Sequence, residues 1–294
     1  MTELKTTIEK YQDVEFWRDL CPGLSITEDK SLGAHSSYGK NKSIRAGDWE
    51  QCKDLINNEG YFAYESWFDP ELIDRLAECL RQLEKHEILP AFCFVYDEFW
   101  ELMLRLDPLL SDLLGEYWLL PAVWAWHVKP ENQTAFTPHR DQVREAAIDD
   151  DDHLDYLTIW IPLTDLNHLS SCICVLPASA DPDYDSGTDR VAVENLQDIR
   201  TLQGKRGSVF CWTTGLVHWG TKQSQQGTPR ISVGLYVQNP EAECFDPPPM
   251  DFTNPFSLQQ RISLVGQQII DYARGANNDL LRLASSLIEL SGES

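Results

Sequence analysis

Apolar residues follow a helical spacing in the first third of the chain. Residues 59–76 open with a short apolar run that predicts a strand, and Asp69 with Pro70 predicts a turn. Beyond this turn the sequence predicts an amphipathic helix. Its apolar stripe contains Leu72, Ile73, Leu76, Cys79 and Leu80. A second helical pattern fills 96–118, and Gly115 is expected to end its last helix.

From residue 121 the pattern changes to short aromatic and β-branched runs, which predict strands. Turn residues separate these runs, and prolines fall at their ends. Short strands after a helical N-terminal third predict a mainly β member of the α+β class. We expect a β-sandwich or jelly roll with helices packed on one face. The predicted strands are 121–130, 155–163, 171–179, 207–214 and 230–238.

The two ends of the chain are predicted to be helical extensions of this core. Residues 1–58 are polar and mixed, with short helical patterns and a loop-like run at 33–43. Residues 59–240 carry the core, and residues 241–294 return to helix. The apolar stripe of this tail fits the core of the same chain or a second subunit. We expect a single domain with the tail packed on it, and a homo-oligomer through the C-terminal helices is the alternative.

The composition indicates a folded protein and excludes two kinds of partner. The 294 residues include 42% hydrophobic residues and ten tryptophans, enough for a packed core. The net charge of −23 disfavours nucleic acid and anionic membranes, because phosphates are bound through Lys and Arg. The N-terminal sequence lacks the pattern of a secretory signal, and no run is apolar enough to span a membrane. The eight cysteines form no CxxC pair, so we expect the reducing cytoplasm.

Three residues have the pattern of a metal site. His139 and Asp141 lie two residues apart, so both side chains point the same way on an extended chain. His218 follows a predicted strand and turn that can return the chain to the same place. Two histidines and one carboxylate can occupy one face of an octahedral iron, leaving three positions open. A nitrogen and oxygen donor set without thiolate favours Fe(II) over a structural zinc site.

An arginine and a serine form a candidate carboxylate receptor. Arg230 opens the last predicted strand, and Ser232 lies two residues later on the same face. The planar guanidinium can bind both oxygens of a carboxylate, and burial strengthens the pair. A dicarboxylate co-substrate could therefore chelate the iron at one end and bind Arg230 at the other.

These motifs together resemble the phytanoyl-CoA dioxygenase-like family of Fe(II)/2-oxoglutarate-dependent oxygenases. The resemblance covers roughly residues 58–240. The motifs stand in the order that this family uses: the opening strand and helix, His-x-Asp, a Trp-bearing strand, a strand ending in Leu-Pro, the distal His, and Arg-x-Ser. They are EGYFAYESWFDPELIDRL (59–76), FTPHRDQ (136–142), YLTIWIPLTDL (156–166), CICVLPAS (172–179), RGSVFCWTTGLVHWGT (206–221) and PRISVGLYV (229–237).

The resemblance implies a fold, a set of cofactors and roles for particular residues. The family fold is a double-stranded β-helix, which is a jelly roll. By resemblance, iron binds the three metal-site residues, and Arg230 and Ser232 hold the distal carboxylate of 2-oxoglutarate. Trp160 matches the strand tryptophan beside this co-substrate, and O2 is the second co-substrate. The implied reaction is hydroxylation of an unactivated C–H bond. We expect the substrate to be a small molecule, either amino-acid-like or a specialised metabolite, or a residue in a peptide.

Several alternatives stay open at this point. His127 lies on the opposite face of its strand from Trp124 and Trp126. It either reaches the pocket and contacts 2-oxoglutarate or substrate, or is a satisfied core histidine. The acidic run at 145–155 is either a solvated loop or a lip that attracts a cationic amine or peptide. The same iron site could also support desaturation, cyclisation or epoxidation. A non-catalytic jelly-roll binding protein is the alternative from another class.

Overall fold

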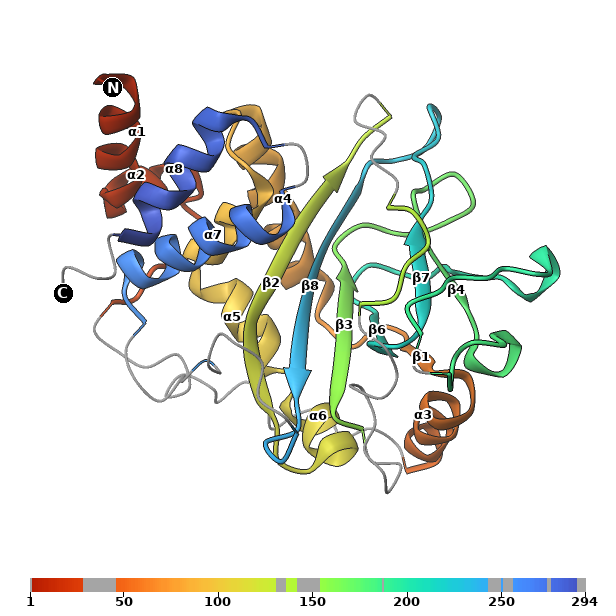
Figure 1. Cartoon of the computed structure of the whole chain (residues 1–294). Coiled ribbons are helices and arrows are strands. Elements are labelled where there is room, and N and C mark those ends of the chain that lie inside the picture. The colour runs from red at the N-terminus through yellow and green to blue at the C-terminus, as the bar shows by residue number, and fades with distance from the viewer. Residues whose placement is uncertain are drawn as a thin grey trace.

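The computed structural model describes residues 2–28, 46–130, 136–141, 154–186, 188–242, 250, 256–273 and 276–289. The predicted loop at 33–43 and residues 145–153 of the predicted acidic loop lie outside the described residues. Within the described part, two antiparallel sheets lie beside a layer of helices (Figure 1). No helix in this part is long and apolar enough to cross a membrane.

The chain begins with helices, continues with a region rich in strands, and ends with helices. The helices are α1 (Thr2–Gln12), α2 (Val14–Leu20), α3 (Ala46–Glu59), α4 (Pro70–Lys85), α5 (Asp97–Leu104), α6 (Asp107–Leu114), α7 (Leu258–Tyr272) and α8 (Asn278–Glu289), with short 3₁₀ helices η3 (Pro90–Val95), η5 (Ala178–Ala180) and η6 (Leu196–Asp198). The strands are β1 (Tyr61–Tyr64), β2 (Trp118–Val128), β3 (Tyr156–Pro162), β4 (Ile173–Leu176), β5 (Arg200–Leu202), β6 (Val209–Thr213), β7 (Val217–Gly220) and β8 (Arg230–Gln238).

The larger sheet separates two hydrophobic cores. Its strand order is β1-β6-β3-β8-β2, and the smaller sheet has the order β5-β4-β7. Figure 1 shows α4, α7 and α8 on one side of β2 and β8, and β4 and β7 on the other. Side chains alternate between the two faces of a strand. Ile159 of β3 therefore joins the core under the helices, whereas its neighbour Trp160 joins the core between the sheets.

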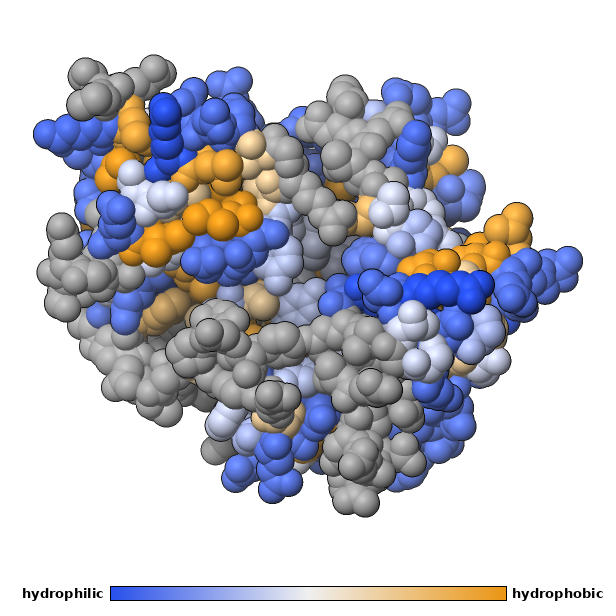
Figure 2. All heavy atoms as spheres, viewed as in Figure 1, coloured by the Kyte–Doolittle hydropathy of each residue, from blue (hydrophilic) through white to orange (hydrophobic). Residues whose placement is uncertain are grey.

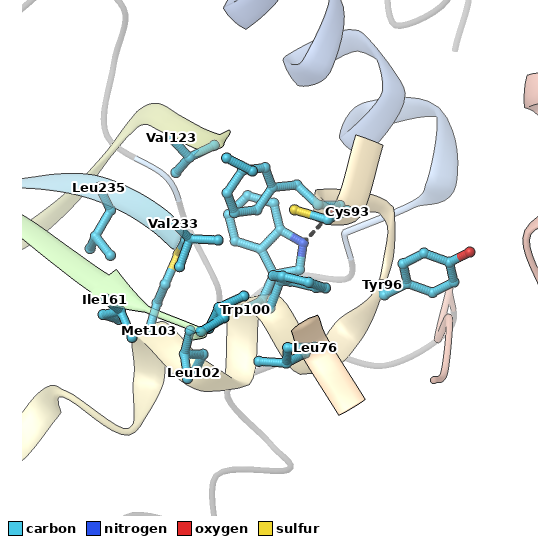
Figure 3. Close-up of a cluster of buried hydrophobic side chains, with 14 of the residues drawn as sticks. Leu76, Cys93, Tyr96, Trp100, Leu102, Met103, Val123, Ile161, Val233 and Leu235 are labelled. Carbon is cyan, nitrogen blue, oxygen red and sulfur yellow. Dashed lines mark hydrogen bonds between the residues drawn. The ribbon is translucent and has the colours of Figure 1, made fainter. Parts of the chain in front are cut away.

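A buried tryptophan is central to the core between the helices and the larger sheet. Trp100 of α5 has 0% exposure, and its indole Nε1 donates to Phe94 O at 2.8 Å. Figure 3 shows Leu76 from α4 on one side of it and Val123 and Val233 from the strands on the other. A buried indole supplies a large apolar area, and its N–H needs the partner that Phe94 provides.

The predicted amphipathic helix is confirmed as α4. The Asp69 side chain accepts a hydrogen bond from Glu71 N, and Pro70 fits the first turn because its missing N–H would be unpaired there. All five predicted stripe residues are buried. Gly115, with φ of 72°, ends α6 as expected.

The C-terminal helix α7 packs on β2 at an irregularity in the strand. The register between β2 and β8 shifts between Leu119 and Val123, as a β-bulge does. The buried side chain of Gln268 donates to Pro121 O at 2.7 Å and accepts from Val123 N at 3.0 Å. One side-chain amide thus satisfies two backbone groups that the bulge removes from the ladder and anchors α7 to the larger sheet.

The surface over the C-terminal helices is partly apolar. In Figure 2, hydrophobic side chains gather on the face formed by α7 and α8. Ile270 is 43% exposed and Leu281 is 37% exposed. The expected contact with a second subunit through these helices stays a prediction.

A buried arginine fastens α7 to the N-terminal helical layer. Arg261 has 0% exposure, and its Nη1 lies 2.6 Å from Asp97 Oδ1 and donates to Val95 O at 2.8 Å. Its Nη2 donates to Thr27 O, and its Nε donates to Phe256 O. Every part of the guanidinium therefore has a partner, as a buried charge requires.

Replacing this arginine should strongly destabilise the protein. In Arg261→Met the carboxylate of Asp97 stays buried without its cation, so we expect the free energy of unfolding to fall by about 3–5 kcal/mol. Urea unfolding followed by circular dichroism measures this change. The control is Arg282→Met, whose side chain is 73% exposed and pairs only across one helical turn. The control should change stability by less than about 0.5 kcal/mol. Equal effects of the two variants would contradict the prediction.

Candidate metal centre and its cavity

The structure brings His139, Asp141 and His218 together. One ligand atom from each can be chosen so that all lie within 4.8 Å of one another. Each histidine Nε2 lies 3.7 Å from Asp141 Oδ1. A two-way backbone bridge holds the two segments in register: His139 N donates to His218 O at 3.1 Å, and His218 N donates to His139 O at 2.9 Å. The backbone bridge therefore fixes the positions of the two histidines relative to each other.

The hydrogen bonds of both imidazoles leave the same nitrogen available for a metal. His139 Nδ1 lies 2.8 Å from Thr137 O, and His218 Nδ1 lies 3.0 Å from Leu216 O. A carbonyl oxygen only accepts, so each Nδ1 must carry the proton. Each Nε2 then presents its lone pair toward Asp141, which is the tautomer that a metal ligand needs.

The carboxylate of Asp141 is oriented from the larger sheet. Thr158 Oγ1 donates to Asp141 Oδ2 at 2.8 Å. Tyr236, which pairs with Thr158 across β3 and β8, also interacts with Asp141 through its hydroxyl. Burial raises the pKa of Tyr236 well above its ordinary value, and the nearby carboxylate acts in the same direction. The phenol therefore stays protonated and can donate, which leaves Oδ1 to face the histidines.

The residue between the first two candidate ligands is also fixed. Arg140 Nη1 lies 2.7 Å from Asp181 Oδ2, and the two side chains are 3% and 0% exposed. The same nitrogen donates to Gly215 O at 2.6 Å, in the turn that precedes His218. Arg140 thus ties the His-x-Asp segment to the segment of the third ligand. The motif was visible in the sequence, but the partners of Arg140 were not.

A second buried arginine, Arg230, lies near the candidate metal ligands. Arg230 is 2% exposed and lies with its guanidinium carbon 5.6 Å from the centre of the Trp160 ring. Its Nη1 donates to Ser171 O at 3.3 Å. Burial lowers the pKa of Arg230 to about 10, so the side chain remains charged at neutral pH. Ser232 follows on the same face of β8, is fully buried, and pairs in register with Trp126.

One cavity of about 490 Å³ joins these groups. The three candidate metal ligands and Arg230 line it, together with aromatic side chains that come mostly from the larger sheet. The aromatic lining residues are Trp124, Trp126, Phe136, Trp160, Trp212, Tyr236 and Tyr272. The sequence singled out some of these tryptophans, whereas Tyr236 and Tyr272 were missed.

His127 is not brought to this cavity. It faces the helical side of β2, with Nδ1 2.9 Å from Glu84 Oε2 of α4. Lys129 also pairs with Glu84, and both basic residues thus lie on the face away from the candidate ligands. The expectation that His127 contacts a co-substrate does not match this placement. Trp124 and Trp126, on the other face of the strand, line the cavity instead.

Comparison with known proteins gives a likeness of fold. No protein-family model and no curated protein matches the chain. Among solved structures, the non-heme monooxygenase ThoJ matches with TM-score 0.56 and 12% identity over 81% of this chain and 99% of its own. The non-heme alpha ketoglutarate dependent epimerase SnoN from nogalamycin biosynthesis matches with TM-score 0.53 and 16% identity, covering 70% and 96%. SnoN in complex with Fe3+, alpha ketoglutarate and nogalamycin RO matches with TM-score 0.51 and 17% identity, covering 66% and 85%. The chain therefore shares the fold of these enzymes.

Proposed function

We propose that the protein is a non-haem Fe(II)- and 2-oxoglutarate-dependent dioxygenase that hydroxylates an unactivated C–H bond of a small molecule. The observation that carries this proposal is the placement of His139, Asp141 and His218 beside buried Arg230 in one cavity. Metal ligands alone would suit many sites. A buried cation next to them adds the second requirement, a receptor for an anionic co-substrate.

The candidate ligands fit Fe(II). They offer two neutral imidazole nitrogens and one carboxylate oxygen, the donor set of iron oxygenases, in which three coordination positions stay open. Thr158 holds the second carboxylate oxygen, and backbone carbonyls hold both imidazoles. Such supporting hydrogen bonds set the direction and basicity of metal ligands.

The anionic co-substrate fits a group of buried donors without partners. Arg230 Nε, Ser232 Oγ, Trp126 Nε1 and Trp212 Nε1 are buried, and none has a hydrogen-bond partner within the described part of the chain. Buried polar groups are almost always paired, and a buried charge without a counter-ion is costly. A carboxylate of 2-oxoglutarate would supply both the missing acceptors and the missing negative charge.

The protein's part in the proposed reaction is to position and shield. When bound, Fe(II) and 2-oxoglutarate supply the oxidation of a C–H bond by dioxygen. Arg230 fixes one end of the co-substrate, so that its other end can face the metal ligands. Thr158 and Tyr236 keep Asp141 aimed at the metal. The aromatic walls exclude water and hold the substrate at a defined angle.

The similarities support a finer placement as well. Two sheets enclosing a cavity, together with the strand order, support a double-stranded β-helix. The order of motifs supports a position among the phytanoyl-CoA dioxygenase-like enzymes. SnoN acts in nogalamycin biosynthesis by its name, which supports a specialised metabolite as the substrate here.

The metal and co-substrate should produce a visible absorption band. We expect anaerobic addition of Fe(II) and then 2-oxoglutarate to give a weak metal-to-ligand charge-transfer band, because both ligand sets meet at one iron. His139→Ala should abolish the band by removing a ligand. His168→Ala is the matched control, since His168 is exposed on a loop and should leave the band unchanged. Absence of both the band and metal binding in the unaltered protein would overturn the proposal.

Arg230 should control the affinity for 2-oxoglutarate. Arg230→Gln removes the buried cation opposite the co-substrate carboxylate, a loss of about 2 kcal/mol or more, so Kd should rise about 30-fold or more. Anaerobic titration calorimetry on the Fe(II)-loaded protein measures this affinity. Arg200→Gln is the control, because Arg200 is exposed and its side chain donates only to backbone carbonyls of its own segment. An unchanged Kd in Arg230→Gln would exclude this residue as the carboxylate receptor.

A further inference from the structure

One end of the cavity has a chemical character different from the Arg230 end. Trp124, Tyr236 and Tyr272 line it with aromatic rings, and Asp271 adds a carboxylate. The rings of Trp124 and Tyr272 lie with centroids 5.7 Å apart and their planes inclined by 48°. Two inclined ring faces beside a carboxylate form the kind of surface that attracts a cation.

The strand β8 shows that this end lies away from the proposed co-substrate site. Arg230 and Tyr236 sit on the same face of β8, six residues apart, which separates their backbones by about 20 Å. Asp141 interacts with Tyr236, so the candidate metal ligands adjoin the aromatic end. The volume of about 490 Å³ falls in the range of about 300–1,000 Å³ typical of sites for drug-sized ligands. The cavity therefore has room for a substrate beside a small diacid.

The position of the aromatic end is fixed by α7. Gln268 binds the backbone of the β2 bulge at Pro121 and Val123, which brings the last turn of α7 over the cavity. Asp271 and Tyr272 are the last two residues of this helix. The C-terminus of a helix carries a partial negative charge, which adds to that of Asp271.

The charges at this end all favour a cation. Asp271 is exposed at the cavity mouth, and its two oxygens accept from Gln267 Nε2 at 3.0 and 3.2 Å, which orients the carboxylate. Burial raises the pKa of Tyr272 to about 12, and Asp141 and Asp271 act in the same direction. The two arginines that line the cavity within the described residues, Arg140 and Arg230, belong to the metal segment and the opposite end.

We propose that this end of the cavity binds an ammonium group of the substrate, so that the enzyme acts on an alkylated amine or quaternary ammonium compound. The role as substrate site rests on the proposed function, whereas the ammonium site itself can be measured without metal. The aromatic faces hold the cation's apolar shell, and Asp271 supplies the opposite charge. The bound cation then lies beside the metal ligands, with the carbon skeleton directed toward them.

A pair of probes with the same shape tests the charge requirement. Choline and 3,3-dimethylbutan-1-ol differ in a positively charged nitrogen against a neutral carbon. In titration calorimetry on the metal-free full-length chain, we expect choline to bind about tenfold or more tightly than the alcohol. Equal affinity would mean an apolar pocket for neutral substrates and would overturn the proposal. Absence of choline binding would overturn it as well.

Variants separate the two parts of the site. Asp271→Asn should weaken choline binding severalfold, and Asp279→Asn, an exposed carboxylate on α8, should leave it unchanged. Tyr272→Leu should lose binding, whereas Tyr272→Phe should retain it because the ring face persists. Unfolding midpoints check that each variant is folded. Equal binding by Tyr272→Leu and the unaltered protein would exclude the aromatic contact.

Failure of this inference can be told apart from failure of the proposed function. The anaerobic charge-transfer band with Fe(II) and 2-oxoglutarate reports the metal and co-substrate sites without any ammonium compound. A band that forms, with no preference for choline over the alcohol, would leave the oxygenase and remove the ammonium site. Choline binding without a band would leave an ammonium-binding cavity and remove the oxygenase.

Discussion

The alternation of side chains along β8 is the constraint on which both the core and the site depend. Its odd-numbered residues lie in the core under the helices, and its even-numbered residues lie on the opposite face, where Arg230, Gly234 and Tyr236 line the cavity. The first set is Ile231, Val233, Leu235 and Val237, and the second is Arg230, Ser232, Gly234 and Tyr236. A slip of one residue would exchange the two sets. The apolar core therefore fixes the register that places the proposed receptor for the co-substrate.

The third residue of the second set, Gly234, must be a glycine. A Cβ at Gly234 would lie 2.9 Å from the ring of Trp126, which pairs diagonally across the same face of the sheet. Trp126 fills that space and lines the cavity, and its indole N–H has no hydrogen-bond partner among the residues that the structure describes. The absence of a side chain at Gly234 therefore allows Trp126 both to pack against β8 and to line the cavity. Strand β8 has no side chain at Gly234, and the Trp126 side chain from β2 occupies that space.

The helical layer shapes the cavity as well as the core. Arg261 holds α7 to the N-terminal helices, and Gln268 holds it to the bulge in β2. These two side chains lie two turns of one helix apart and fix it at both contacts. The last turn of α7, with Tyr272, can then form a wall of the cavity without belonging to either sheet. The contacts that stabilise α7 therefore also set the shape of the proposed substrate site.

Sequence patterns predicted the elements with strong periodicity and missed those set by distant contacts. The last predicted strand, 230–238, has the bounds of β8, because both faces of that strand carry a regular pattern. The short strands β5 and β7 were missed, since three or four residues carry too little periodicity. The spacing of the candidate ligands was readable, but Thr158 as the partner of Asp141 was not, because this contact depends on how the His-x-Asp segment lies against β3.

His127 shows a limit of a different kind. Its separation from Trp124 and Trp126 onto the other face of β2 follows from alternation alone. Alternation does not show which face of β2 lines the cavity, because other parts of the chain cover both faces of this strand. Only the position of α4, with Glu84 beside His127, decides it.

Three buried arginines give the strongest argument from charge. Arg261 and Arg140 lie 2.6 and 2.7 Å from the carboxylates of Asp97 and Asp181. Arg230 is buried as deeply, yet no carboxylate of the described residues lies within ion-pair distance of it, in a chain with 47 acidic residues. A fold that pairs two buried cations and leaves the third facing a cavity supports the proposal that this charge binds an external anion. The candidate metal ligands at the same cavity favour an anion that can also reach a metal, as a 2-oxo diacid can.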